Sequence, residues 1–293
     1  MKKWIWITLS IVVIIAAGTW INYSKQPKGV EVKTSKVQEK EIKAYISTTG
    51  DILSKDKQQY FGEQGIVDDI DVEVGDKVSE DDILMRFKTA YGNKNLRSDI
   101  DGVVTELNVS EGQMNSLTQP VVVVQNVENL QVEVQLSKYD APTVKAGQQV
   151  DITYNEKVYK GEVSSIDPTA DKNTSNIMGT NSSDVYQNAY INIFDPKGLV
   201  IGFNVDVDIL INQNDKTSVV PIESIVSDND GNDFVYIVEN GKVVKKDIKL
   251  GIISDTEAEI KSGLKKGEKV ILNPGNDISK GVEVVIVPKG ENK

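Results

Sequence analysis

Apolar and polar residues alternate with a period of two over much of the chain, the pattern of β-strands with one face on a core and one face in water. The clearest examples are residues 130–136 (LQVEVQL) and 205–211 (VDVDILI). Denser β-branched and aromatic runs, typical of more deeply buried strands, occupy residues 121–125, 234–238 and 282–287. The pattern therefore predicts a mainly β protein.

Few segments break this pattern. Residues 137–147 (SKYDAPTVKAG) are predicted to form a short helix, limited by Pro142 because proline lacks the amide hydrogen that an interior helical turn needs. Residues 169–188 are rich in Asn, Ser, Thr and Gly, and residues 88–99 are polar, so both are predicted to be loops. No long segment with a 3.6-residue period occurs downstream of the N-terminus, which argues against a helical bundle or coiled coil.

The N-terminal segment, residues 1–23, is predicted to be a transmembrane anchor. Residues 4–21 carry no charge, and as a helix they would extend roughly 27 Å, close to the ~30 Å of a bilayer's hydrocarbon core. Two lysines precede this run, and tryptophans lie at both of its ends, where indole rings favour the headgroup layer. These anchor residues are Lys2, Lys3, Trp4, Trp6 and Trp20.

The charge next to the anchor predicts its orientation. The two lysines favour a cytoplasmic N-terminus, so the bulk of the chain is expected to be extracytoplasmic. The alternative is a cleaved signal peptide, since Ala16 and Gly18 are small enough for a processing site. The apolar run continues past both residues to Ile21, which favours a retained single-pass anchor in the cell membrane.

The composition excludes several kinds of chemistry. The 293 residues include no histidine and no cysteine, which excludes imidazole bases, imidazole metal ligands, thiolate nucleophiles and disulfides. Without Lys2 and Lys3, residues 22–293 hold 31 of the 33 basic and all 44 acidic side chains, a net charge of −13. A nucleic-acid partner is therefore not expected. We expect no catalytic residue, no metal and no cofactor, and so a protein that is not an enzyme.

A phrase of the sequence occurs twice, at an offset of 37 residues. GIVDDIDVEVGDKV begins at Gly65 and GVVTELNVSEGQMN begins at Gly102. Each copy is predicted to be a strand, a glycine turn and the start of another strand, with glycines supplying positive φ. Because one copy alone would leave an apolar face exposed, we expect the two copies to bury these faces against each other. The matched pairs are Gly65/Gly102, Ile66/Val103, Val67/Val104, Ile70/Leu107, Val72/Val109 and Gly75/Gly112.

The doubled phrase resembles the biotinyl/lipoyl-like hammerhead, and its place in the chain resembles that in the membrane fusion protein family, also called periplasmic adaptor or HlyD-like proteins. Later phrases continue the resemblance to the family's β-barrel and membrane-proximal domain. They are VKAGQQVDI (residues 144–152), YKGEVSSIDPTAD (159–171), VVPIESIV (219–226), GNDFVYIVENGKVVKKDIKLG (231–251) and IKSGLKKGEKVIL (260–272). The resemblance covers nearly all of the chain after the predicted anchor.

The resemblance implies an architecture: a mainly β fold with an N-terminal transmembrane helix, a lipoyl-like hammerhead, a β-barrel and a membrane-proximal β domain in an elongated array. The implied boundaries are 1–23 for the anchor, 24–48 for the first strands of the membrane-proximal domain, 49–126 for the hammerhead, 127–214 for the barrel and 215–293 for the rest of the membrane-proximal domain. The hammerhead halves would be about residues 50–87 and 100–126, joined by the connector 88–99.

The resemblance also implies a function: a membrane-anchored adaptor subunit of an ATP-binding-cassette (ABC) efflux system of the macrolide-exporter type. Its partners would be a permease, a separate ATPase and further copies of itself, and its cargo would be amphipathic molecules such as antimicrobial peptides. Many family members insert a long α-helical hairpin between the hammerhead halves, and its tip docks onto an outer-membrane channel. Here that place holds only residues 88–99, which points to a single-membrane, Gram-positive-type bacterium.

A second hypothesis comes from another class: a surface-anchored binding or sensing protein with no transport role. Exposed strand edges in such a protein would bind an extended peptide by adding a strand to a sheet. The sequence alone leaves both hypotheses open, and an enzyme is a distant third.

Candidate chemical sites have plainer interpretations. Lys88 and Lys94 flank the place where a biotin or lipoyl carrier presents its modified lysine, but the usual Met-Lys-Met and Asp-Lys-Ala contexts are absent, which favours solvated loop lysines. Two acidic clusters offer carboxylates for acid–base work, but they are predicted to lie beside turns as solvated faces. These clusters are Asp68-Asp69-Asp71 and Glu80-Asp81-Asp82.

Residues 228–239 (DNDGNDFVYIVE) resemble a calcium-binding loop. Asp228, Asp230 and Asn232 offer oxygen ligands, and Glu239 is twelfth in the window. However, Gly231 is fourth rather than sixth, and the flanking residues are predicted to be strands. A polar hairpin turn is therefore favoured over a metal site.

Overall fold

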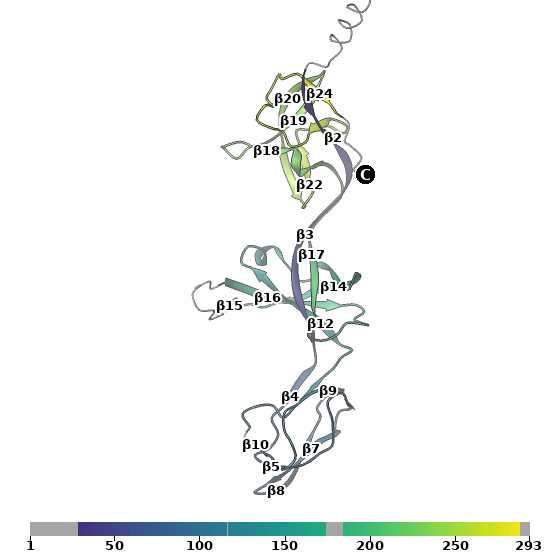
Figure 1. Ribbon diagram of the computed structural model, residues 1–293, viewed down its shortest axis with the longest axis vertical. Helices are drawn as coiled ribbons and strands as arrows, with labels where there is room; N and C mark the ends of the chain where they lie inside the picture. The colour runs from purple at the N-terminus through teal and green to yellow at the C-terminus, as the bar shows by residue number, and fades with distance from the viewer. Residues whose placement is uncertain (1–28, 116, 174–183, 288–293) are drawn as a thin grey trace, which may run out of the picture. The chain divides into compact units, whose positions relative to one another are not determined.

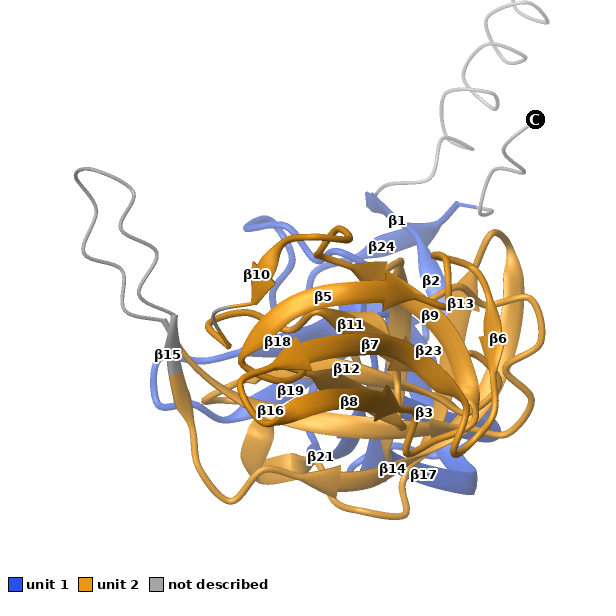
Figure 2. Ribbon diagram, turned by 90° about the horizontal axis from the view of Figure 1, so that it is seen from below, with its two compact units in different colours: residues 1–44, 212–293 blue, residues 45–211 orange. Residues whose placement is uncertain are grey.

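The structure, a computed structural model, describes residues 29–115, 117–173 and 184–287. The chain divides into two compact units, residues 1–44 with 212–293 (unit 1) and residues 45–211 (unit 2), which Figure 2 colours separately. The regular secondary structure of the described residues is almost entirely β-strand, with only two short 3₁₀ turns among these residues, which confirms the mainly β prediction. The predicted anchor lies outside these residues, and no helix within them is long and apolar enough to cross a bilayer.

Residues 57–125 of unit 2 form two four-stranded sheets, which we call the twin-β module. Its strands are β4 (Lys57–Tyr60), β5 (Gly65–Ile70), β6 (Lys77–Val78), β7 (Ile83–Thr89), β8 (Gly92–Arg97), β9 (Gly102–Leu107), β10 (Met114–Asn115) and β11 (Val122–Gln125). One sheet has the order β10-β5-β7-β8 and the other the order β4-β11-β9-β6. The side chains between them form one core, which includes the fully buried Phe87, Leu84 and Met85.

The two copies of the repeated phrase exchange their second strands in this module. β6 of the first copy pairs with β9 of the second, and β10 of the second copy pairs with β5 of the first. The Gly75 N–H donates to the Val104 carbonyl at 2.8 Å, and 37 positions later the Gly112 N–H donates to the Val67 carbonyl at 2.7 Å. The shared core takes Val67 from one copy and Val104 from the other. The prediction that the copies bury each other's apolar faces is therefore confirmed.

The repeated glycines serve two different purposes. Gly75 and Gly112 have φ values of +102° and +79°, in the region that favours glycine. Gly65 and Gly102 instead open β5 and β9 without positive φ, so the positive φ predicted for them is wrong. A Cβ on Gly65 would lie 2.3 Å from the carbonyl oxygen of Lys88, so glycine permits a close approach of two strands there.

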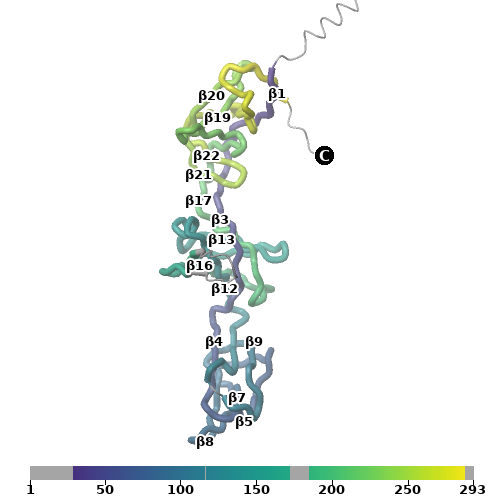
Figure 3. The backbone as a smooth tube through the Cα atoms, turned by 60° about the vertical axis from the view of Figure 1, so that its left-hand side comes forward, coloured from purple at the N-terminus to yellow at the C-terminus, as the bar shows by residue number. Residues whose placement is uncertain are grey.

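A closed six-stranded β-barrel makes up the rest of unit 2. Its strands are β3 (Gln38–Ser54), β12 (Leu130–Ser137), β13 (Gln149–Tyr154), β14 (Lys157–Ile166), β16 (Asp184–Ile193) and β17 (Asn204–Pro221). Their order is β13-β14-β16-β12-β3-β17, and pairing of β13 with β17 closes the ring. Figures 1 and 3 show β3 and β17 side by side. The alternate apolar residues of β12, beginning with Leu130 and Val132, are buried in its core, as the period-two pattern predicts.

Unit 1 contains the first part of β3, up to residue 44, the last part of β17, from residue 212, and several shorter strands. Its other strands are β1 (Val30–Val32), β2 (Thr34–Lys36), β18 (Ile225–Ser227), β19 (Asp233–Glu239), β20 (Lys242–Asp247), β21 (Lys249–Ile253), β22 (Glu257–Ser262), β23 (Lys269–Ile271) and β24 (Val284–Ile286). β19 pairs with β18, β20 and β23, and β23 pairs with β2. β1 pairs in parallel with β24, so segments close to the two ends of the chain meet in one small sheet.

Three local predictions need correction. The helix predicted in residues 137–147 is a single 3₁₀ turn, Ala141–Thr143, because Pro142 leaves no room for a longer ladder of hydrogen bonds. Residues 88–99 are not a loop, since the end of β7 and all of β8 lie there. The loop predicted at residues 169–188 contains β15 (Asp171–Asn173), which pairs with β16, and the start of β16 itself.

Candidate functional site

The β7–β8 hairpin occupies the place between the two halves of the twin-β module. Thr89 lies opposite Gly92, so the turn consists of Ala90 and Tyr91. The Thr89 hydroxyl donates to the Gly92 carbonyl at 2.8 Å and accepts the Tyr91 N–H at 3.1 Å, while Gly92 has a φ of +108°. The Tyr91 side chain is 96% exposed. The hairpin therefore presents an aromatic ring at its tip.

Both lysines considered as carrier sites lie in the strands of this hairpin and not in its two-residue turn. Lys88 is in β7, where its Nζ lies 2.6 Å from Oδ1 of Asp68, and Lys94 is in β8 opposite Phe87. A carrier lysine must be free to present its modified end, whereas Lys88 is held in an ion pair. The positions of both residues fit structural lysines of a hairpin.

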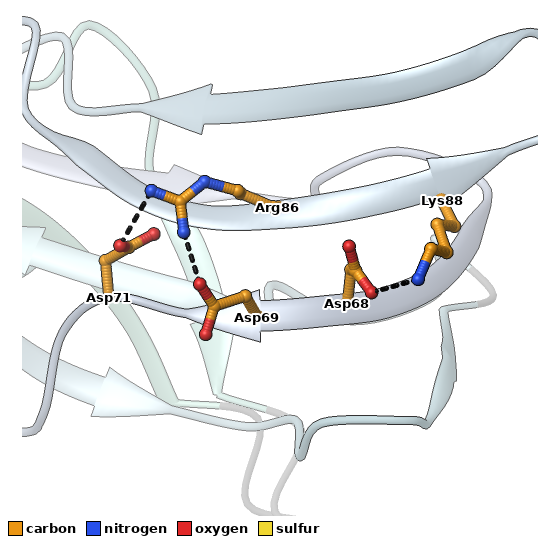
Figure 4. Close-up of polar contacts among 5 residues, drawn as sticks. All are labelled: Asp68, Asp69, Asp71, Arg86 and Lys88. Carbon is orange, nitrogen blue, oxygen red and sulfur yellow. Dashed lines mark hydrogen bonds and ion pairs between the residues drawn. The ribbon is translucent and has the colours of Figure 1, made fainter.

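The acidic cluster of β5 faces the basic residues of β7. Arg86 forms ion pairs with Asp69 and Asp71, the latter at 3.0 Å from Nη2 to Oδ1, beside the Lys88–Asp68 pair (Figure 4). Asp68 and Asp69 lie at the end of β5, and Asp71 directly follows the strand, before the turn at Gly75. All three pairs are partly exposed, so each contributes only ~0.2–1 kcal/mol. Their role is to hold β5 and β7 in register.

The second acidic cluster closes a tight turn between β6 and β7. The Asp82 carboxylate accepts the Ser79 N–H at 2.8 Å, and the Glu80 N–H donates to the Asp101 carboxylate at 2.9 Å. Asp81 adopts a φ of +71°, which aspartate tolerates better than most residues. These contacts explain the acidic residues as turn formers.

The segment that resembles a calcium loop is a polar turn between β18 and β19. The Asp228 carboxylate accepts the backbone N–H groups of Asn232 at 2.8 Å and Asp230 at 3.0 Å. The Asn232 N–H is the main cause that lowers the pKa of Asp228 below its usual value of 3.8. Glu239 ends β19, six residues after Asp233, or roughly 20 Å away at ~3.3 Å per residue. The four oxygen residues therefore cannot surround one ion.

No group of three or more acidic side chains close enough to hold a metal occurs within residues 29–115, 117–173 and 184–287. The described region does contain one buried carboxylate, Glu259 of β22, which is 6% exposed. Its Oε1 accepts hydrogen bonds from the Asn214 amide at 2.7 Å and the Thr217 hydroxyl at 2.8 Å, and its Oε2 accepts the Ile252 N–H at 2.9 Å. Glu259 thereby ties β17 and β21 to β22. No sequence motif indicated this residue, because a single glutamate in an alternating strand looks like a solvent-facing one.

Exposed apolar side chains gather at the hairpin end of the twin-β module. Met114 of β10 lies opposite Ile66 of β5, and these residues are 64% and 42% exposed. The β7–β8 turn reaches the same end, because Ile66 is the register partner of Lys88. In the sequence, Ile66 is marked only as a matched position of the repeat, and no pattern indicates Tyr91 or Met114.

Asn115 brings two further apolar residues to this end. Its side-chain amide donates to the carbonyl oxygen of Phe61 at 2.8 Å, and its Oδ1 accepts the Leu117 N–H at 3.3 Å. Phe61 and Leu117 are 44% and 43% exposed. We call this group the tip surface, and it consists of Phe61, Ile66, Tyr91, Met114 and Leu117.

Two protein families match successive stretches of this chain. Residues 130–209 match the YknX-like beta-barrel domain, and residues 217–286 match the YknX C-terminal permuted SH3-like domain. These stretches of 80 and 70 residues together make up 150 of the 293 residues. The chain belongs to the membrane fusion protein family, of the macrolide-exporter type. The resemblance found in the sequence is therefore confirmed.

Known relatives and structures agree with this assignment. YknX of Bacillus subtilis (strain 168), whose name describes an efflux system component, is 25% identical over 97% of this chain and 100% of its own length. The macrolide export protein MacA of Yersinia pestis is 24% identical over 60% of this chain and 47% of its own. MacA from Actinobacillus actinomycetemcomitans shares the fold, with a TM-score of 0.70 and 20% identity over 83% of this chain and 99% of that chain. An adaptor role in an efflux system follows for this protein.

Proposed function

We propose that this protein is the membrane-anchored, extracytoplasmic adaptor subunit of an ABC-type export system. It binds a permease that works with a separate ATPase, assembles with further copies of itself, and shapes the exit path for amphipathic cargo. The observation that supports this most is the order of the domains along the chain. The chain passes from unit 1 through β3 into the barrel and the twin-β module, and returns through β17 to complete unit 1. The matches to the two YknX domains follow the same order.

The sequence supports an anchored location. Residues 4–21 are uncharged, and β1 begins at Val30, only a few residues after the predicted anchor. Unit 1, which contains β1, is therefore the part that we assign to the membrane-proximal position. We also propose that the N-terminus is cytoplasmic and that the cell has a single membrane, since a short β-hairpin joins the halves of the twin-β module in this chain.

A permease that co-purifies with the adaptor is the decisive test. The full-length protein is tagged at its C-terminus in its native cell and purified in mild detergent. We expect a permease and an ATPase in near-stoichiometric amounts. A form without residues 1–23 serves as the control, and we expect it to be released from the membrane and to recover less permease. Purification of the full-length protein without any permease would refute the adaptor proposal and favour a surface-anchored binding or sensing protein.

A further inference from the structure

The side chains of the tip surface lie outside the core of the twin-β module. Tyr91 is almost fully exposed on the two-residue turn, and Met114 is exposed to 64% beside Ile66. The opposite faces of β5 and β7 are buried, since Val67 and Phe87 lie in the core of the module. Five large apolar side chains at one end of a small module form the kind of exposed patch that commonly marks an interaction site.

The backbone around the tip surface is held firmly. Asn115 is 5% exposed, and its amide donates to the carbonyl oxygens of Phe61 and Glu63 at 2.8 and 3.0 Å. Gly65 packs directly against the Lys88 carbonyl. These contacts fix the loop after β4 against β10, and β5 against β7. The apolar side chains therefore rest on an ordered support, which lowers the entropic cost of binding a partner.

The charge around the tip surface indicates what it binds. Residues 57–125 contain 13 acidic and 6 basic side chains, a net charge of −7. Glu63 and Glu111 lie close to the patch, at the loop after β4 and in the turn before β10. Arg86 and Lys88, the basic residues on the neighbouring strand, are already neutralised by Asp68, Asp69 and Asp71. An apolar surface within an acidic module attracts partners that are both apolar and basic.

Two other occupants are disfavoured by the same observations. A second copy of this chain would place one acidic module against another, with a net charge of −7 on each side. Strand addition at the free edge of β8 is disfavoured because that edge is short and polar and carries Lys94 and Arg97, the kind of charge that blunts edge pairing. We propose that the tip surface binds a free cationic amphipathic peptide, which is the cargo class of the exporter. The cargo role rests on the function proposed above, whereas the binding itself does not.

Binding is tested on the full-length protein in nanodiscs of zwitterionic phosphatidylcholine. This lipid carries no net charge, so it does not attract a basic peptide electrostatically. The probe is a fluorescein-labelled amphipathic helix of Lys and Leu, titrated by fluorescence anisotropy against empty nanodiscs. Two control peptides replace every Lys with Glu, or every Leu with Ser. We expect only the Lys/Leu peptide to bind, and more weakly as salt rises from 50 to 500 mM. Equal binding of either control peptide, or of empty nanodiscs, would overturn the proposal.

A triple variant of the tip surface locates the site. Ile66→Thr, Tyr91→Ser and Met114→Gln change exposed side chains, and we expect them to weaken binding at least about tenfold. The matched control changes three exposed apolar residues of the barrel, Tyr139→Ser, Val158→Thr and Phe194→Ser, and should leave binding unchanged. Equal affinity of the tip variant and the wild type, with both folded by circular dichroism, would refute the site.

Co-purification of the permease separates the two proposals. If the tip variant loses peptide binding and still recovers the permease, both proposals stand. If the wild type recovers the permease but binds no Lys/Leu peptide, the peptide site is refuted and the adaptor function stands. If the peptide binds at the tip surface but no permease is recovered, the adaptor function is refuted, and the cargo role falls with it.

Discussion

Replacing Glu259 with glutamine should destabilise unit 1 by about 2 kcal/mol at pH 7. The carboxylate is 6% exposed and accepts three hydrogen bonds, from Asn214, Thr217 and the Ile252 N–H. Glutamine has one acceptor oxygen and one NH₂ group. If its oxygen keeps the contacts with Asn214 and Thr217, its NH₂ faces the N–H of Ile252 as a second donor. An orphaned buried donor costs ~1–3 kcal/mol, and loss of the charge weakens the remaining hydrogen bonds.

The pH dependence of this difference is set by the pKa of Glu259. The Ile252 hydrogen bond is the main cause that lowers this pKa below its usual value of 4.5, while burial opposes the shift. A lowered folded-state pKa means that the ionised group adds stability above the unfolded-state pKa and loses it as the pH falls through the folded-state value. The advantage of the wild type over Glu259→Gln should therefore be complete at pH 7 and shrink progressively below about pH 4.5.

Thermal unfolding by circular dichroism and calorimetry measures this difference. For a unit of this size, ~2 kcal/mol corresponds to a fall in Tm of about 10 °C. The matched control is Glu257→Gln in the same strand, where the glutamate forms a partly exposed ion pair with Lys40 at 2.7 Å and should contribute less than ~1 kcal/mol. Equal losses in the two variants at pH 7, or a Glu259→Gln effect that does not change between pH 7 and pH 3, would refute the reasoning.

Two further predictions concern the twin-β module. Phe87→Ala should lower the free energy of unfolding by ~3–5 kcal/mol, because Phe87 is fully buried. Hydrogen exchange should show β5 and β9 losing protection together, since both copies of the repeat share the core that contains Phe87. Loss of protection in β5 alone would contradict a shared core. Gly112→Asn should cost less than ~1 kcal/mol because asparagine tolerates the φ of +79° at this position. Gly102→Asn should cost ~2 kcal/mol or more because its Cβ would lie 2.7 Å from the Gln125 carbonyl oxygen. Chemical denaturation of the two variants measures both losses, and a larger loss for Gly112→Asn would refute this reasoning.

The sequence predicts the strands whose two faces differ in burial. In β12 the alternation of Leu130 and Val132 with Gln131 and Glu133 survives intact, because one face lies on the barrel core. β8 was missed because it is an edge strand whose residues are almost all exposed, so no apolar period marks it. Its only inward partner is Leu96, opposite Met85. An exposed edge strand is defined by its neighbour, and single-sequence patterns do not contain that neighbour.

The repeat predicts the shared core but not the exchange of strands. Pairing β6 with β5 or with β9 would satisfy the same apolar pattern, because Val67 and Val104 are equivalent in the two copies. The exchange depends on the direction in which the turns at Gly75 and Gly112 lead the chain, and the apolar pattern of the sequence does not specify that direction. The tip surface escaped prediction for a similar reason. Phe61, Tyr91 and Met114 lie far apart in the sequence, and the contacts of Asn115 and the strand register of the β7–β8 hairpin bring them to the same end of the module.

The long strands β3 and β17 lead to a last prediction, that the cores of the protein unfold separately. In each strand, a stretch without buried side chains separates two runs that contain them. In β17, Val205, Val207 and Ile209 lie in the barrel core, residues 212–217 lack a buried side chain, and Val220 lies in the core of unit 1. Among the residues that the structure describes, none belongs to the core of both units. The losses from Glu259→Gln and Phe87→Ala should therefore be additive within ~0.5 kcal/mol.

Calorimetry of the two single variants and the double variant tests this separation. Glu259→Gln should lower the midpoint of one transition and leave the transition affected by Phe87→Ala unchanged, because Phe87 packs only within the twin-β module while Glu259 ties strands of unit 1. Each exposed stretch of β3 and β17 then acts as a covalent link that transmits little stability from one core to another. A single transition that both substitutions shift together would show that the exposed stretches couple the cores, and the argument from burial would fail.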